Sequence, residues 1–175
     1  GFRPGRGCHD AIEAIFTTVV GRNPHRRWIL DADLVAAFDR IDHDRLLESL
    51  GAFPARDRIA AWLKAGVVER EQFTPTGEGT PQGGVISPLL LNVALHGLET
   101  AAGVRYHPEH VKHAGGVTPN SPLVVRYADD LVALCHSAEQ AQQVKENLAR
   151  WLAPRGLAFN EDKTRIVGLE DGFDF

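Results

Sequence analysis

Two adjacent acidic residues, Asp129 and Asp130, interrupt an otherwise apolar stretch of the chain. The runs on either side, 123–126 and 131–134, are apolar and rich in Leu and Val, which predicts two strands joined by a turn with acids at its tip. Neighbouring carboxylates repel each other, and burying them costs desolvation. Mg²⁺ takes oxygen ligands of this kind and would offset both costs. Because Asp is also common in ordinary turns, the pair alone does not decide between a metal site and a simple turn.

A two-metal site needs at least one further carboxylate from elsewhere in the chain. The run from Trp28 to Asp33 is apolar and ends in acids, so it predicts a strand that could supply one. Asp31 and Asp33 share a face of that strand, and periodicity alone does not choose between them. Either acid could instead be a helix cap or a surface residue.

Helical and strand patterns alternate along the chain. Helices are expected at 10–20, with Asp10 as the N-cap, and at 43–50, 56–65, 87–102 and 138–152; strands are expected at 28–33, 123–126, 131–134, 157–159 and 164–167. The segment 76–84 is rich in Gly, Thr and Pro and predicts a loop, as does the irregular segment 104–122. Strands separated by helices, with one acid-tipped hairpin, predict an α+β fold in which helices back an antiparallel sheet.

Composition limits the remaining possibilities. With 175 residues, 43% of them hydrophobic, the chain can bury one real core. The net charge of -4 argues weakly against a nucleic-acid partner, but residues 1–27 hold five arginines against two acids. No apolar run is long enough to span a membrane and no signal peptide is visible, so we expect a cytoplasmic protein without a membrane partner. Because it starts with Gly1 and lacks methionine, we expect a fragment of a longer protein.

Neither cysteine, Cys8 or Cys135, belongs to a CxxC pair, so both are expected to be free thiols. His107, His110 and His113 recur every three residues, a spacing that raises the question of a zinc site. The segment contains Pro108 and two glycines, lacks cysteine and has no recognised zinc-ligand spacing, so we do not expect zinc there.

Four motifs occur in an order that resembles reverse transcriptases: D-x-x-x-x-F at 33–38, P-Q-G-G-x-x-S-P at 81–88, Y-A-D-D at 127–130 and G-L-x-x-N-x-x-K-T at 156–164. The opening GFRPGRGCHD, the run QGGVISPL and the ending GFDF are similar to bacterial group II intron-encoded reverse transcriptases and maturases. The resemblance covers essentially the whole chain. It implies a right-hand polymerase palm with partial fingers, in which 1–27 and about 43–84 are fingers-related and 28–42 and 85–175 form the palm. An earlier fingers segment and a thumb, present in family members, would lie outside the chain.

The resemblance also implies a ligand set for two Mg²⁺ ions, or for Mn²⁺ in their place. It selects Asp33 over Asp31, because the family's aromatic residue falls five positions after the metal-binding acid. Asp33 and Asp129 would hold both ions and Asp130 would assist. The main-chain carbonyl of Leu34 would be a further ligand.

Three further side chains are implied to bind the incoming nucleotide. The ring of Phe38 would lie beneath the sugar and leave no room for a 2′-hydroxyl, although by pattern alone a core Phe on a strand is the simpler interpretation. Lys163 would lie near the triphosphate, where a cation offsets developing charge, and is otherwise a solvated turn lysine. Tyr127 would complete the nucleotide site beside the acids.

The loop around Gln82 and the N-terminal arginines are the other implied contacts. Gln82 would reach the incoming nucleotide or the template backbone, while Gly83 permits close approach of nucleic acid. Arg3 and Arg6 would contact template phosphates, or else are ordinary surface arginines.

The implied activity is RNA-directed DNA synthesis, in which dNTPs are joined to the 3′-hydroxyl of a DNA primer on an RNA template. One alternative is an RNA-binding maturase fragment that assists splicing of intron RNA and is inactive as a polymerase; pure binding has no use for three converging acids. A second alternative is another palm-type enzyme such as a nucleotide cyclase, which needs neither Gln82 to Pro88 nor the Y-A-D-D turn.

Overall fold

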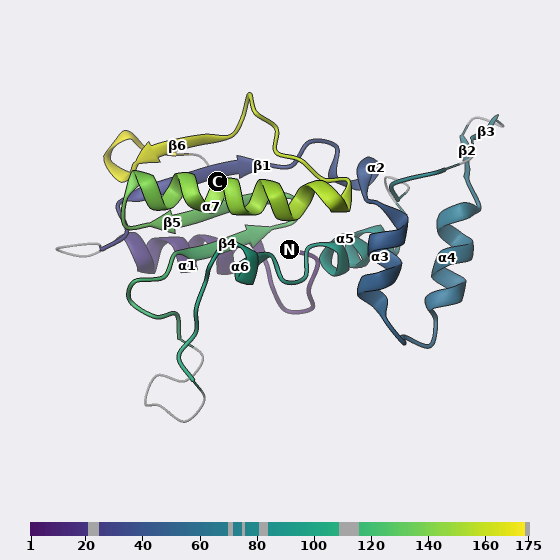
Figure 1. The fold of residues 1–175 in the computed structure, drawn as a ribbon, viewed down its shortest axis with the longest axis horizontal. Helices are drawn as coiled ribbons and strands as arrows, with labels where there is room; N and C mark the ends of the chain where they lie inside the picture. The colour runs from purple at the N-terminus through teal and green to yellow at the C-terminus, as the bar shows by residue number, and fades with distance from the viewer. Residues whose placement is uncertain (21–24, 70–71, 75, 81–83, 109–115, 174–175) are drawn as a thin grey trace. The chain divides into compact units, whose positions relative to one another are not determined.

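The computed structural model describes residues 1–20, 25–69, 72–74, 76–80, 84–108 and 116–173 (Figure 1). The chain forms two compact units. We call Gly1–Leu34, Gly97–Trp151 and Phe159–Phe175 the sheet unit, and Val35–His96 and Leu152–Ala158 the helical unit. None of the helices in the described part of the chain is both long and apolar enough to cross a membrane.

A four-stranded antiparallel sheet forms the centre of the sheet unit, in the order β4-β5-β1-β6. The strands are β1 (Trp28–Asp33), β4 (Leu123–Tyr127), β5 (Asp130–Cys135) and β6 (Arg165–Gly168). The predictions of these strands are confirmed to within one residue. The strand expected at 157–159 is wrong: only Phe159 pairs, with Leu34, because the chain enters a turn at once, where the amides of Lys163 and Thr164 donate to the carbonyl of Asn160.

Helices pack against this sheet (Figure 1). Helix α1 (Cys8–Val19) contacts β4, and its buried residues join one face of the sheet in a core of Ala11, Ile15, Ile29, Val125, Val132 and Leu134. Figure 1 shows α7 (Ala138–Leu152) lying along the strands, and its residues Ala141, Val144 and Leu148 are buried. Burial of each large aliphatic side chain contributes about 1.5–3 kcal/mol, so this layering fixes the strands that carry the acids.

The start of α1 differs from the prediction. The helix begins at Cys8 with Gly7 as its N-cap, three residues before the expected N-cap, Asp10. Asp10 lies in the first turn and accepts a hydrogen bond from the amide of Gly7 at 2.6 Å. The reason is that a carboxylate three residues into a helix can satisfy the free amide at its start as well as an N-cap side chain can.

The helical unit contains α2 (Ala37–Arg40), α3 (His43–Leu50), α4 (Arg56–Lys64), α5 (Ser87–Ala94) and the short turn η1 (Ala153–Arg155). Helix α3 contacts α4, α5 and η1. A hairpin of β2 (Val67–Glu69) and β3 (Gln72–Thr74) was not predicted from the sequence.

The single helix expected at 87–102 is wrong. Helix α5 ends at Ala94, and a separate one-turn helix, α6 (Leu98–Ala101), follows in the sheet unit. Gly97 between them has φ 92°, a left-handed conformation that ends a right-handed helix.

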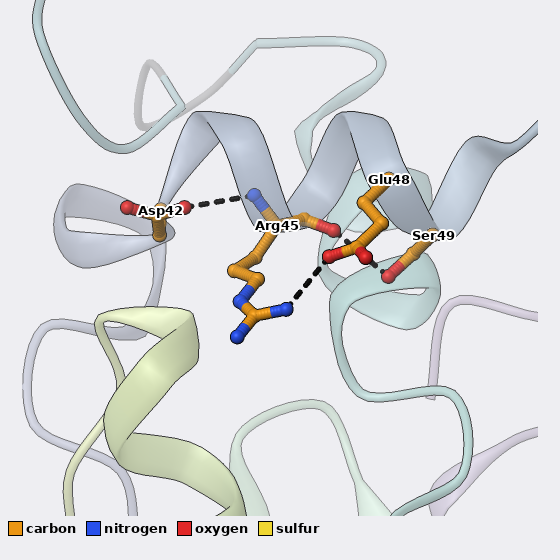
Figure 2. Close-up of polar contacts among 4 residues, drawn as sticks. All are labelled: Asp42, Arg45, Glu48 and Ser49. Carbon is orange, nitrogen blue, oxygen red and sulfur yellow. Dashed lines mark hydrogen bonds and ion pairs between the residues drawn. The ribbon is translucent and has the colours of Figure 1, made fainter.

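Local hydrogen bonds explain why α3 begins and continues where it does (Figure 2). The carboxylate of Asp42 accepts from the amide of Arg45 at 2.8 Å and caps the helix. One turn on, the Arg45 guanidinium donates to Glu48 at 2.8 Å, and the hydroxyl of Ser49 donates to the carbonyl of Arg45 at 2.9 Å. A cap of this kind stabilises a helix by about 1 kcal/mol.

Candidate active site

The sheet brings two of the predicted acids onto neighbouring strands. Asp33, the last residue of β1, is the cross-strand partner of Asp130, the first residue of β5. Antiparallel partners have Cα atoms roughly 4.5–5.5 Å apart. Asp129 directly precedes Asp130 in the β4–β5 turn. The sheet therefore brings Asp33 and Asp130 together from segments almost a hundred residues apart in the sequence, with Asp129 next to this pair along the chain. Convergence of the Asp129 carboxylate on the same point stays a prediction.

The turn that carries Asp129 has an unusual backbone. Tyr127 and Asp130 are paired, so Ala128 and Asp129 alone form the loop. Ala128 has φ 56°, in the left-handed region that two-residue hairpin loops need at their first position and that Gly usually occupies. The guanidinium of Arg126 donates to the carbonyl of Ala128 at 2.6 Å. Sequence reasoning missed Arg126, although a charged residue inside an apolar strand was a visible signal.

A pocket of about 370 Å³ opens beside these acids and is formed entirely by the sheet unit. Its lining residues are Asp31, Ala32, Asp33, Asp130, Asp162, Lys163 and Arg165. The ammonium group of Lys163 lies 3.0 Å from the Asp33 carboxylate, and Arg165 lies 3.1 Å from that of Asp31. Asp31, which the resemblance set aside, thus shares the pocket with Asp33 but has a cation of its own.

The electrostatics of the pocket favour a cation. The pKa of the Asp130 carboxyl is raised, mainly by burial and further by the negative charges of Asp129 and Asp33. The positive charge of Lys163 lowers that pKa by a smaller amount. The hydrogen bond to Asp33 raises the pKa of Lys163, and Asp130 and Asp129 add to that effect. Negative charge is therefore concentrated at the end of β1 and the start of β5, where a bound cation would relieve the repulsion.

In the described part of the chain, no group of three or more His, Cys, Asp or Glu side chains forms a ready-made metal site. Mg²⁺ rarely needs one, because it keeps several water ligands and binds through one or two carboxylates together with substrate phosphates. The carboxylates of Asp33 and Asp130, cross-strand partners in a pocket of excess negative charge, fit that mode of binding. The side chain of Leu34 is buried, and the use of its main-chain carbonyl as a ligand stays a prediction.

The residues predicted to bind the nucleotide lie in different settings. Phe38 belongs to the one-turn helix α2 of the helical unit and is half-buried, so it is neither on a strand nor fully in a core. Its carbonyl accepts from the amide of Thr80 at 2.6 Å. Gln82 and Gly83 lie outside the described residues. Tyr127 is partly buried and packs against the core cluster beneath α1.

The remaining predicted residues lie at the surface or outside the described chain. Arg3 and Arg6 are both exposed, and Arg6 lies 3.6 Å from Asp10. Arg3 is close enough to Arg126 for its charge to lower the pKa of that guanidinium, so it lies near the acid-bearing hairpin. His107 is described, but His110 and His113 are not. Both cysteines are free, Cys8 exposed and Cys135 buried, as predicted.

Several known proteins are similar to this chain. A family model described as reverse transcriptase (RNA-dependent DNA polymerase) matches residues 1–175. Protein YkfC of Escherichia coli K12 is 32% identical over 200 residues, covering all of this chain and 52% of that protein. The group II intron-encoded protein LtrA of Lactococcus lactis is 40% identical over 103 residues, covering 57% of this chain and 16% of that protein. The chain thus spans about half, or less, of the length of these relatives.

Solved structures of Candida tropicalis telomerase share the fold. The apo enzyme superposes with a TM-score of 0.65 at 15% identity, covering 96% of this chain and 34% of that one. A telomerase in complex with a fragment of telomeric RNA superposes with a TM-score of 0.62 at 14% identity, covering 96% of this chain and 30% of that one. At such identities the likeness shows the fold alone, and it confirms the prediction of a polymerase palm with an antiparallel sheet and helices.

Proposed function

The chain belongs to the reverse transcriptase family, and we propose that it is the catalytic part of a group II intron-encoded RNA-directed DNA polymerase. In this proposal it joins dNTPs to the 3′-hydroxyl of a DNA primer while copying an RNA template. The observation that carries the proposal is the pairing of Asp33 with Asp130 beside the Asp129 turn, on a rigid sheet. A site built on strands holds its side chains in a more precise geometry than a site built on loops does.

The acids are the proposed metal ligands. Asp33 and Asp129 hold two Mg²⁺ ions, or Mn²⁺ in their place, while Asp130 assists and the carbonyl of Leu34 is a further ligand. When bound there, the ions would lower the pKa of the primer hydroxyl and would neutralise negative charge on the triphosphate and the leaving pyrophosphate. The raised pKa of Asp130 supports this assignment, because burial and the nearby charges of Asp129 and Asp33 both disfavour its ionised form, and a bound cation would offset these costs.

Other residues orient the substrates in this proposal. Lys163, whose ammonium already lies 3.0 Å from Asp33, contributes positive charge beside the triphosphate. Phe38 excludes a 2′-hydroxyl, and Tyr127 and Gln82 bind the incoming nucleotide. Selection of the sugar by a ring is steric, so it needs Phe38 to be partly exposed, as it is.

Nucleic acid is the proposed macromolecular partner. Arg3 and Arg6 contact template phosphates and Gly83 permits close approach of the strand. The exposure of both arginines supports this role. In the same proposal, residues 1–27 and about 43–84 serve as fingers and the rest as palm, and the intact protein also binds its intron RNA.

Replacement of Asp129 with Asn tests the proposal, because it removes one charge and hardly changes shape. In the intact protein, Asp129→Asn is expected to abolish primer extension on an RNA template with dNTPs and Mg²⁺, while RNA binding is retained. Asp162→Asn is the matched control, since Asp162 lines the same pocket but is not a proposed ligand. Extension by Asp129→Asn at the wild-type rate would refute the site. Wild-type protein that binds intron RNA but does not extend a primer would favour the maturase alternative.

A further inference from the structure

Arg126 is a charged residue within a strand of the central sheet. It follows the buried residues Val124 and Val125 in β4 and is itself half-buried. Because side chains alternate along a strand, Arg126 points to the opposite face from its neighbour Tyr127, which packs against the core beneath α1. Its Nη1 atom donates to the main-chain carbonyl of Ala128 at 2.6 Å. The side chain of Arg126 therefore extends along β4 and binds the turn in which that strand ends.

That carbonyl belongs to the most constrained residue of the hairpin. Ala128 has φ 56°, a strained conformation for an L-residue that persists only where the surrounding structure holds it. Pairing of Tyr127 with Asp130 holds the two ends of the loop. The Arg126 bond holds its middle, at the peptide group that joins Ala128 to Asp129. The direction of the Asp129 side chain depends on the orientation of that same peptide.

The charge of Arg126 also acts on this group of residues. Burial and the nearby charge of Arg3 lower the pKa of its guanidinium, while the negative charges of Glu99 and Asp129 raise it. Arg126 therefore lies in the field of Asp129, and a cation on this side of the turn offsets part of the repulsion among the acids.

We propose that Arg126 is a positioning residue: its bond to the Ala128 carbonyl fixes the turn and so directs the Asp129 carboxylate toward the divalent metal ion. This inference rests on the proposed function, in which Asp129 is a metal ligand. Arg suits the role because its planar group stays charged and loses little freedom when it binds a carbonyl.

Three variants test the proposal in the intact protein. Arg126→Met removes the charge and the donor but keeps an unbranched apolar stem. Arg126→Lys keeps a cation with a donor and should restore part of the function. Arg26→Met is the matched control, because Arg26 is also half-buried and donates to main-chain carbonyls, those of Ser121 at 2.7 Å and 3.1 Å and of Thr118 at 3.4 Å, but not in the acid-bearing turn.

Two measurements do not depend on activity: hydrogen exchange of the amides at 127–130, and binding of Mn²⁺ followed by electron paramagnetic resonance. Arg126→Met is expected to speed exchange in the turn at least about tenfold and to weaken Mn²⁺ binding by a similar factor, with Arg126→Lys in between. Primer extension should then need about tenfold more Mg²⁺ for half-maximal rate, with little change in the KM for dNTP. Arg26→Met should change none of these quantities.

The proposal is overturned if Arg126→Met matches the wild type in exchange and Mn²⁺ binding, or if Arg26→Met produces the same changes. If Arg126→Met does not fold, Arg126→Gln replaces it, because Gln loses both the charge and the reach to the carbonyl while remaining polar. Failure of the proposed function gives a different result: Asp129→Asn would then bind Mn²⁺ and extend primers like the wild type, whatever Arg126 does.

Discussion

The ammonium group of Lys163 lies 3.0 Å from a carboxylate oxygen of Asp33, although the two residues are 130 positions apart in the chain. The turn between Phe159 and β6 brings Lys163 to the end of β1. A proposed triphosphate-binding cation is therefore held at the proposed metal ligand itself. The pair is largely exposed on the lysine side, so its contribution to folding is small and its importance is expected to be functional.

Replacing Lys163 with Met should therefore lower the rate of nucleotide addition with little effect on folding. We expect a loss of about 10- to 100-fold in kcat/KM for dNTP, typical of removing a charge that stabilises a developing anion, and a change of less than about 1 kcal/mol in stability. Steady-state primer extension and thermal unfolding measure the two effects. The control is Lys145→Met, since Lys145 pairs with Glu161 at 2.8 Å outside the pocket. An equal loss of activity in both variants would contradict the prediction.

Asp130 should weaken the fold at neutral pH. Its pKa is raised in the folded protein, so its ionisation costs more there than in the unfolded chain, whose value is near the ordinary 3.8. The cost is fully present above the folded-state pKa and disappears below about pH 3.8. Without divalent ions, Asp130→Asn should raise the melting temperature at pH 7 by up to about 3 °C, given its exposure. The gain should shrink as the pH falls toward 4; a gain independent of pH would indicate a different cause.

The acid-bearing hairpin and β1 could be predicted because their signals are local. Apolar runs that end in acids are typical of strands that deliver carboxylates to a site. The break at Gly97 could not be predicted in the same way, because the sequence on both sides of it favours a helix and only the observed φ of 92° shows the interruption. The β2–β3 hairpin was missed because strands of three residues carry too little pattern.

Pairing across the sheet limits what sequence can show about the site. Asp31 and Asp33 have the same local pattern, and the difference between them comes from β6: Asp31 is the cross-strand partner of Arg165, while Asp33 faces Lys163 from the preceding turn. Such registers are set by the whole sheet and have no local signature. The same reasoning applies to Arg126, whose partner is the carbonyl of a turn with an unusual backbone.

Gly79 should be essential to the loop that leads to Gln82. It has φ +77°, and an added Cβ would meet the main chain of Asp39 at 2.5 Å. Its carbonyl also accepts from the ring of His43 at 2.6 Å. Gly79→Ala should therefore destabilise the protein by more than about 2 kcal/mol, since it combines a strained conformation with a backbone clash.

Two other glycines separate these effects in the same chemical denaturation experiment. Gly51 has φ +53° and ψ -125° with open space around it, so Gly51→Ala should cost about 1–3 kcal/mol from conformation alone, without the added clash expected at Gly79. At Gly77 an added Cβ meets nothing and no positive φ is present, so Gly77→Ala should change stability by less than about 0.5 kcal/mol. Equal costs at Gly79 and Gly51 would show that the loop moves away from Asp39 freely.

Phe38 should control the choice between dNTPs and rNTPs. Its half-buried ring lies on the one-turn helix α2, so it has a surface to present to a substrate, unlike a fully buried residue. Phe38→Val keeps an apolar wall but removes much of the volume, and relief of a steric clash changes discrimination without altering the metal ligands. We expect rNTP incorporation to rise at least about tenfold while dNTP use falls only a few-fold. If Phe38 is purely structural, Phe38→Val should instead lower stability and reduce the use of both nucleotides equally.

Phe53→Val is the matched control, because Phe53 lies in the same unit and is 52% exposed. Single-nucleotide extension with dNTP and rNTP in parallel gives the ratio directly, and a ratio unchanged from wild type in Phe38→Val would rule out its role in sugar selection.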